Sequence, residues 1–217
     1  MTPPPFRHAL PQHNLVLASA SATRRRMFDA ASVAIEGIAA PVDEEAIKQA
    51  AIAEGIAPED IAVLLAEMKA SAVAMRQTSP AFVIGCDQIL LCEGVIYSKP
   101  TDPEMAAQQL RALSGRSHKL ITAAVIFRDG QRIWHHIETP RLTMRVLEDA
   151  FIVDYLEAIG PAAFWSPGSY QVETDGAHLF QSIDGCHYAV LGMPLLHILA
   201  FLREHGLAYQ REAGEPC

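Results

Sequence analysis

The sequence predicts a mixed α/β fold, because short β-branched apolar runs alternate with amphipathic helical stretches along the chain. The run Phe82–Ile84 ends at Gly85 and indicates a buried strand. Two longer β-rich runs, 120–127 and 133–146, flank Asp129-Gly130, a strong hairpin signal. Apolar residues at helical spacing over 58–76 predict a long helix.

Length and composition fit one domain of ordinary to large size, or two small lobes, and we assign them to residues 14–206, with a loose proline-rich leader at 1–13 and a tail at 207–217. Half of the 217 residues are hydrophobic, enough for a substantial core. The net charge of −8 argues against a general nucleic-acid-binding role. No signal peptide or membrane-length apolar run is visible, so we expect a cytoplasmic, soluble protein with no membrane partner.

The first predicted strand, 14–18, leads into a hydroxyl-rich turn and a basic helix start that contains Ser21, Thr23 and Arg24. Backbone N–H groups at a helix N-terminus, together with arginine, can bind an anion such as phosphate. The alternative is that Ser21 is only an N-cap and the arginines face water. The segment lacks the glycines of a phosphate-binding loop.

Three carboxylates, at positions 43–45, precede a predicted helix and follow a predicted strand over Val33 to Ala40. Acids at a helix N-terminus complement its dipole, and the functional alternative is a metal ligand at Glu44. Lys69 lies on the long helix over 58–76, where an isolated lysine is usually solvated.

Asp87 follows the run Phe82–Ile84, so we expect it at the end of a central strand, where α/β sheets form ligand crevices. Lys99 precedes a proline twelve residues later and is biased to an extended backbone. A carboxylate and a lysine on neighbouring strand ends suit metal-assisted chemistry on a phosphate. The alternative is that Asp87 merely caps a turn.

The remaining segments are predicted with ordinary signals. Helices are expected from Asp102, over 148–159 and over 194–204; the segments 160–176 and 182–192 are expected to be a long loop and a turn-rich region. His135 and His136 are adjacent, and neighbours on a strand point to opposite faces, so we expect no metal pair there. Cys86 and Cys92 lie in apolar runs, which indicates buried small hydrophobes and disfavours a thiol enzyme.

Five separated segments together resemble the Maf family of nucleoside triphosphate pyrophosphatases. They are Leu17 to Arg24, Val42-Asp43-Glu44, Gly85-Cys86-Asp87 with Lys99-Pro100, Leu113 to His118, and Gly185 to Leu195. The resemblance covers residues 14 to 205. It implies two lobes around a curved central mixed sheet with a nucleotide cleft, as in inosine triphosphate pyrophosphatase-like folds.

The family also implies hydrolysis of the α–β phosphoanhydride of a nucleoside triphosphate, with Mg²⁺ or Mn²⁺ as cofactor. By this resemblance Ser21, Arg24, Lys69 and Lys99 are similar to the phosphate clamp. Glu44 and Asp87 resemble the carboxylates that hold metal or activate water, and Asp87 matches the family's proposed general base. The family often forms homodimers.

The base specificity is predicted from Thr23, Gln88 and Glu173. Gln88 and Glu173 look like the subgroup that acts on 7-methyl-GTP, whereas Thr23 departs from both known subgroup patterns. A carboxylate at Glu173 could accept from N1–H and the exocyclic amine of guanine. The alternatives are a dTTP/UTP pyrophosphatase with the same catalytic residues, and a non-catalytic nucleotide-binding regulator of cell division.

Overall fold

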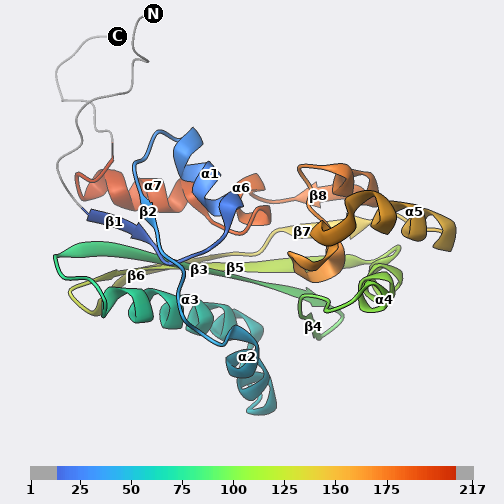
Figure 1. Cartoon of the computed structure of the whole chain (residues 1–217), viewed down its shortest axis with the longest axis horizontal. Helices are drawn as coiled ribbons and strands as arrows, with labels where there is room; N and C mark the ends of the chain where they lie inside the picture. Colours follow the sequence, from blue (N-terminus) through green and yellow to red (C-terminus); the bar gives the residue numbers. More distant parts are fainter. Residues whose placement is uncertain (1–13, 209–217) are drawn as a thin grey trace, which may run out of the picture.

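The computed structural model describes residues 14–208, which form one eight-stranded mixed sheet with helices on both faces (Figure 1). The strand order is β2-β1-β3-β5-β7-β8, with β4 paired to β3 and β6 paired to β5. β1 pairs in parallel with β2 and β3, and the other pairings are antiparallel. The predicted mixed α/β class is confirmed.

The elements have the following bounds. The strands are β1 (Asn14–Leu17), β2 (Glu36–Gly37), β3 (Ala81–Cys92), β4 (Val95–Tyr97), β5 (Ser117–Arg128), β6 (Gln131–Glu138), β7 (Arg141–Met144) and β8 (Phe180–Asp184). The α-helices are α1 (Ala22–Ala30), α2 (Glu44–Ala53), α3 (Pro58–Ala74), α4 (Pro103–Leu113), α5 (Asp149–Ile159), α6 (His187–Val190) and α7 (Leu195–Glu204). Three short 3₁₀ helices are η1 (Gly160–Phe164), η2 (Pro167–Ser169) and η3 (Asp175–Leu179).

Three buried clusters stabilise the fold, and the two twelve-residue strands β3 and β5 contribute to all of them. One cluster lies between the sheet and helices α1 and α7, and a second lies between the sheet and α3. The third joins the far ends of β3 and β5 to α4 and α5. The molecule in Figure 1 therefore has two lobes that share the long strands.

One correction concerns the central strand, because Asp87 lies in the middle of β3 and not at its end. Pairing with β5 is continuous from Phe82 to Leu91. On the other edge, β1 pairs with β3 only as far as Ile84, and β4 pairs with it only from Leu90 onward. Among the described residues, the five positions between have no strand on that edge. The sequence predicted that the strand ends near Asp87. In the structure β3 continues past Asp87, and what ends before that residue is its pairing with β1.

Other boundaries also differ from prediction. The strand expected over Val33–Ala40 is only Glu36–Gly37, and the run 133–146 is divided into β6 and β7 around Pro140, which cannot donate to a sheet ladder. The turn-rich region 182–192 contains the end of β8 and the short helix α6.

The hairpin is confirmed: Asp129 and Gly130 join β5 to β6 with φ of 52° and 77°, as a turn with two left-handed residues requires. The predicted leader at 1–13 and residues 209–217 of the tail lie outside the described residues. Leu207 and Ala208 pack in the cluster under α7. No helix within residues 14–208 is both long and apolar enough to cross a bilayer.

Candidate active site

Three of the predicted residues lie together: Asp87 and Glu44 both form ion pairs with the buried ammonium group of Lys69. Lys69 Nζ on α3 lies 2.5 Å from Asp87 Oδ1 on β3 and 2.8 Å from Glu44 Oε2 at the start of α2. Lys69 and Asp87 are buried, whereas the Glu44 side chain is half exposed. A buried ammonium requires charged partners, because its desolvation is otherwise too costly. The prediction that these residues share a site is consistent with this geometry.

Gly85 allows α3 to pack this closely on β3. A Cβ at Gly85 would lie 2.2 Å from the Ala66 carbonyl oxygen and 2.9 Å from the Ala70 Cβ, both on α3. Gly85 and Asp87 are two residues apart on a strand, so they face the same helix. The missing side chain at Gly85 therefore sets the distance at which Lys69 reaches Asp87.

Arg24 is turned inward, which contradicts the alternative in which the arginines of α1 all face water. Its Nε donates to the Gly192 carbonyl at 2.8 Å, and its Nη1 donates to the Cys86 carbonyl at 2.9 Å and to Ser19 Oγ at 3.2 Å. The Cys86 carbonyl belongs to the unpaired stretch of β3. Arg24 thereby ties α1 and the turn before α7 to that stretch. Its Nη2 makes no hydrogen bond with residues 14–208, so two N–H donors remain for a ligand.

The remaining positions at the start of α1 have structural roles. Ser21 is the N-cap, and its side chain accepts from the Arg24 N–H. Thr23 Oγ1 accepts from Arg26, whose side chain is exposed, as is that of Arg25. The N-cap interpretation of Ser21 is therefore correct.

Gln88 points to the face opposite Asp87, as strand alternation requires. Its Nε2 lies 2.8 Å from Thr122 Oγ1 and from the Ala189 carbonyl, and 3.2 Å from the Val190 carbonyl. Thr122 also donates to the Ala189 carbonyl at 2.9 Å. Gln88 thus holds α6 against the sheet, a role that the sequence analysis did not assign to it.

Lys99 and Glu173 are exposed, and within residues 14–208 neither makes a hydrogen bond or an ion pair with Lys69, Glu44 or Asp87. Ser98 donates to Glu45 Oε1 at 2.9 Å, which places the residue before Lys99 against the residue after Glu44. Buried Gln109 on α4 connects this segment to the loop that leads to Glu173. Its Nε2 donates to the Ser98 carbonyl at 2.8 Å, and its Oε1 accepts from the Gly168 N–H at 2.8 Å.

The sequence analysis missed Gln109 as a connecting residue. The apolar spacing of α4 identifies its buried face, but a glutamine among those positions gives no indication of its partners. Ser19, a second missed residue, is buried where it accepts from Arg24.

Two further groups are buried without charge. Burial raises the pKa of the Cys86 thiol to about 11, which disfavours a thiolate nucleophile. Burial lowers the pKa of His118 to about 4, so its imidazole is neutral at pH 7. His118 Nε2 lies 2.7 Å from the Tyr170 hydroxyl.

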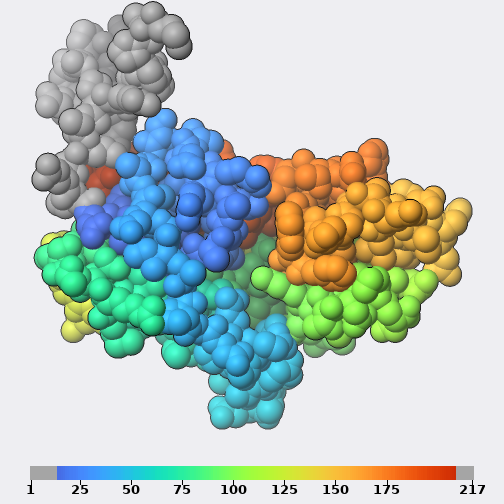
Figure 2. Space-filling model, viewed as in Figure 1, coloured from blue at the N-terminus to red at the C-terminus, as the bar shows by residue number. Residues whose placement is uncertain are grey.

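The carboxylates at this site fit a divalent cation. Glu44 and Asp87 already converge on one positive charge, the Lys69 ammonium. Glu44 Oε1 and Asp87 Oδ2 accept no hydrogen bond within the described chain, so each residue keeps one oxygen for a further ligand. Carboxylate oxygens are what Mg²⁺ and Mn²⁺ prefer. Figure 2 shows a hollow in the surface between α1, in blue, and the orange and green segments of the other lobe.

Comparisons with known proteins place the chain in a family. Residues 14–205 match the family model described as "Maf: Maf-like protein". The chain is 44% identical over 191 residues to "Nucleoside triphosphate pyrophosphatase" of Granulibacter bethesdensis, covering 88% of this chain and 96% of that protein. It is also 44% identical over 192 residues to "7-methyl-GTP pyrophosphatase" of Rhizobium meliloti, covering 88% and 96%.

Among solved structures, a dITP/XTP pyrophosphatase from Mycobacterium abscessus is 13% identical and covers 89% of this chain and 95% of its own. The TM-score between the two structures is 0.39. The family match, in contrast, begins at β1 and ends just after α7, so it includes every element that contributes to the site. The chain therefore belongs to the Maf family.

Proposed function

We propose that this protein hydrolyses the α–β phosphoanhydride bond of a nucleoside triphosphate, releasing the monophosphate and pyrophosphate. The observation that carries the proposal is the convergence of Glu44, Lys69 and Asp87 beside the unpaired edge of β3, where Arg24 is also bound. The names of the curated relatives support the same reaction.

The residues divide the work as follows. Asp87 Oδ2 accepts a proton from the attacking water. The oxygen of that water forms the new bond to phosphorus as the bridging P–O bond breaks and pyrophosphate leaves. Asp87 Oδ1 stays bonded to Lys69, which fixes the carboxylate in place. Lys69, Lys99 and the Nη2 group of Arg24 neutralise the charge of the triphosphate. The start of α1, capped by Ser21, offers backbone N–H donors to a phosphate.

Glu44 would hold a divalent cation through Oε1, beside Asp87, whose Oδ2 is reserved for the proton of the attacking water. When bound, the cation would polarise the phosphate and make water more acidic. We expect pyrophosphate release to need Mg²⁺ or Mn²⁺ and to stop in EDTA.

We further propose 7-methyl-GTP as the substrate. The resemblance of Gln88 and Glu173 to the 7-methyl-GTP subgroup supports this choice, as do two relatives that are named 7-methyl-GTP pyrophosphatase. Glu173 lies on the loop that Gln109 anchors to the Ser98–Lys99 segment, so a base bound there would be linked to the phosphate end of the site. Thr23, half buried on α1, is too small to stack on a base.

The test is pyrophosphate release from 7-methyl-GTP, GTP, dTTP, UTP and CTP in parallel. A preference for 7-methyl-GTP supports the whole proposal, and a preference for dTTP and UTP retains the chemistry but overturns the base. Binding without release from any of them, in folded protein, would favour the non-catalytic regulator.

Glu173→Gln sharpens the test of the base. It should lower kcat/KM for 7-methyl-GTP about tenfold or more and change UTP much less, because guanine offers the carboxylate two adjacent donors, N1–H and the exocyclic amine, whereas uracil has only its N3–H. Asp175→Asn, two residues away and equally exposed, is the matched control. Equal losses on both substrates would show that Glu173 does not read the base.

A further inference from the structure

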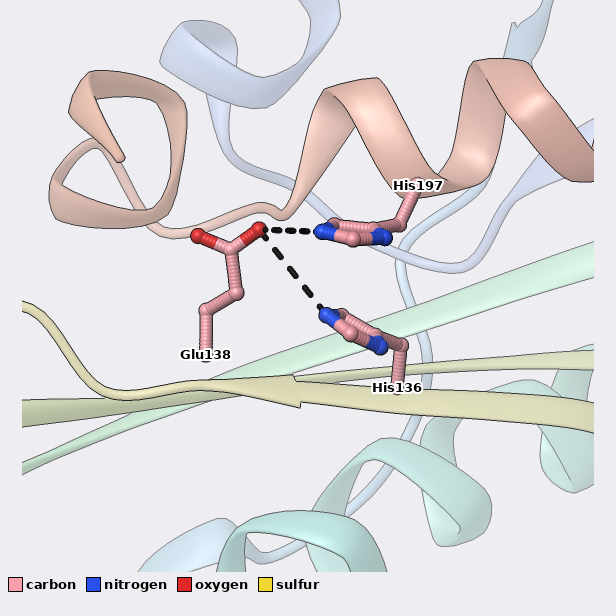
Figure 3. A group of neighbouring side chains, drawn as sticks. All are labelled: His136, Glu138 and His197. Atoms are coloured by element: carbon pink, nitrogen blue, oxygen red, sulfur yellow. Dashed lines mark ion pairs between the residues drawn. The ribbon is translucent and has the colours of Figure 1, made fainter. Parts of the chain in front are cut away.

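Two histidines and a glutamate converge at a place away from the Lys69 cluster. His136 and Glu138 lie two residues apart on β6, so both side chains leave the sheet on the same face. His197 comes from the first turns of α7, which packs over that face (Figure 3). From the adjacent His135-His136 pair the sequence predicted no metal site; Glu138, at the next position on the same face as His136, and His197, about sixty residues further along the chain, were not considered.

The three side chains direct their ligand atoms to one point. His197 Nε2 lies 3.0 Å from Glu138 Oε1, and His136 Nε2 lies 3.9 Å from the same oxygen. All three ligand atoms are within 4.8 Å of one another. Figure 3 shows both Nε2 atoms facing the carboxylate. The 3.0 Å contact from His197 is within hydrogen-bond distance, but the 3.9 Å contact from His136 is too long for a hydrogen bond. His136 Nε2 therefore has no hydrogen bond to this carboxylate.

The surroundings hold the rings in position. The His136 and His197 rings are stacked, with centroids 3.7 Å apart and planes 24° apart. Trp134 lies on the same face of β6 and stacks on His136, with ring centroids 6.0 Å apart. Glu138 is mostly buried, with a side chain 15% exposed, whereas His197 is 49% exposed. Glu138 and His136 are therefore held by their surroundings, and the more exposed His197 ring can turn out of the stack to aim its Nε2 lone pair at a shared ion.

We propose that His136 Nε2, Glu138 and His197 Nε2 form a binding site for a divalent transition metal of the zinc class. Two imidazoles and one carboxylate, with a fourth position open to water, are a ligand set that zinc uses. Imidazole suits Zn²⁺, Cu²⁺ and Ni²⁺, whereas Mg²⁺ prefers oxygen ligands. This site therefore selects a different ion from the one that Glu44 would hold beside Asp87.

Metal at this site would fasten α7 to β6. The neighbouring contact between them is apolar, with Trp134 and Phe201 ring centroids 5.7 Å apart. Glu138 is the register partner of Thr122 on β5, and Thr122 is the partner of Gln88 on β3. The three lie in one row on the face that holds α6, so the metal would stabilise the side of the sheet opposite Asp87. A site made of two separate elements exists only in the folded chain, so binding must raise the unfolding temperature.

The experiment is calorimetric titration of Zn²⁺ into the full-length chain after EDTA treatment and removal of the chelator. Wild type should bind one equivalent of Zn²⁺. The dissociation constant for that Zn²⁺ should be at least tenfold higher in both His197→Gln and Glu138→Gln. His135→Gln is the matched control, because His135 is exposed on the opposite face of the same strand. His8 and His13 are present in every variant, so any zinc that they bind cancels in the comparison.

Two further readouts separate this site from nonspecific binding. Co²⁺ in place of Zn²⁺ should give the visible absorption of a low-symmetry four-coordinate site in wild type and His135→Gln, and lose it in His197→Gln. Zn²⁺ should raise the Tm of the first two proteins only. Equal zinc binding by wild type and His197→Gln, or no binding by wild type, would overturn the proposal; it leaves the pyrophosphatase proposal standing, since Mg²⁺-dependent turnover is assayed separately.

Discussion

Asp87 and Gln88 are neighbours on β3, yet their surroundings differ in every respect that matters for chemistry. Asp87 faces α3 and shares a buried ammonium with Glu44. Gln88 faces α6 and bonds only to neutral groups, the Thr122 hydroxyl and two backbone carbonyls. One strand thus carries a charged side and a neutral side, one residue apart.

The two residues differ in which of their hydrogen-bonding groups remain free to bind a ligand. Asp87 keeps an oxygen that no described residue occupies, whereas both N–H groups of Gln88 have acceptors within reach. The free oxygen of Asp87 can accept a proton or bind a metal. Gln88 has no free donor, and its hydrogen bonds hold α6 in place. We therefore expect changes at Asp87 to affect kcat and changes at Gln88 to affect stability and KM.

The largest expected effect is that of Asp87→Asn, which should lower kcat about 10²- to 10⁴-fold, the usual range for removing a general base. Binding of the nucleotide should persist, because the shape is kept and Lys69 retains Glu44 as a partner. Pyrophosphate release and equilibrium nucleotide binding measure the two quantities separately. Asp154→Asn, an exposed change on α5, is the control. Near-normal turnover would remove Asp87 from the reaction.

Gly85→Ala tests the packing of the charged side. Its Cβ would meet the Ala66 backbone at 2.2 Å, so α3 must shift, at a cost of about 3 kcal/mol in unfolding free energy. Denaturant unfolding measures that cost. Gly37→Ala is the matched control, since its new Cβ would meet only the flexible end of Arg25. Equal stability of the two variants would mean that the α3 contact does not depend on Gly85.

Gln88→Leu tests the neutral side. It takes the Gln88 donor away from the Val190 carbonyl and from the Ala189 carbonyl, which keeps Thr122 as a donor, and this should cost about 2 kcal/mol of stability. KM should rise while kcat changes less than tenfold, because no reacting atom loses a partner. Gln108→Leu, exposed on α4, is the control. A fall in kcat comparable to that of Asp87→Asn would contradict the division between the two sides.

The smallest effect is a pH dependence from His118, which lies on the neutral face beside Tyr170. Burial lowers its pKa to about 4 from an ordinary value near 6.5, so the unfolded chain binds the proton more tightly. His118 therefore contributes its full stability above pH 6.5 and loses it progressively as the pH falls toward 4. The loss between pH 6.5 and 5 should be on the order of 1.5 kcal/mol.

The measurement is urea unfolding at several pH values in wild type and His118→Gln, which keeps a partner for the Tyr170 hydroxyl but does not titrate. The difference between the two proteins should shrink as the pH falls through this window. His178→Gln, at an exposed position, should follow wild type. A difference that is constant with pH would mean that His118 does not stay neutral in the fold.

Most of the secondary structure follows from local signals. Ser21, Asp43 and Asp102 are N-caps at the starts of their helices, and the Asp129-Gly130 turn makes the hairpin. Local signals fail where tertiary contacts decide. The charge at Asp87 suggested the end of a strand, but Lys69 from α3 neutralises it and β5 continues the ladder past it.

The sequence by itself determined the fold class and the family, and it predicted which charged residues the proposed phosphate chemistry would use, because these depend on local periodicity and on residue types at fixed spacing. Only the tertiary structure decided that Lys69 joins Glu44 to Asp87, that Arg24 turns inward and that Gln88 holds α6. It also decided that His197 reaches Glu138. These contacts join segments far apart in the chain, and such pairings depend on how closely helices approach the sheet, as at Gly85.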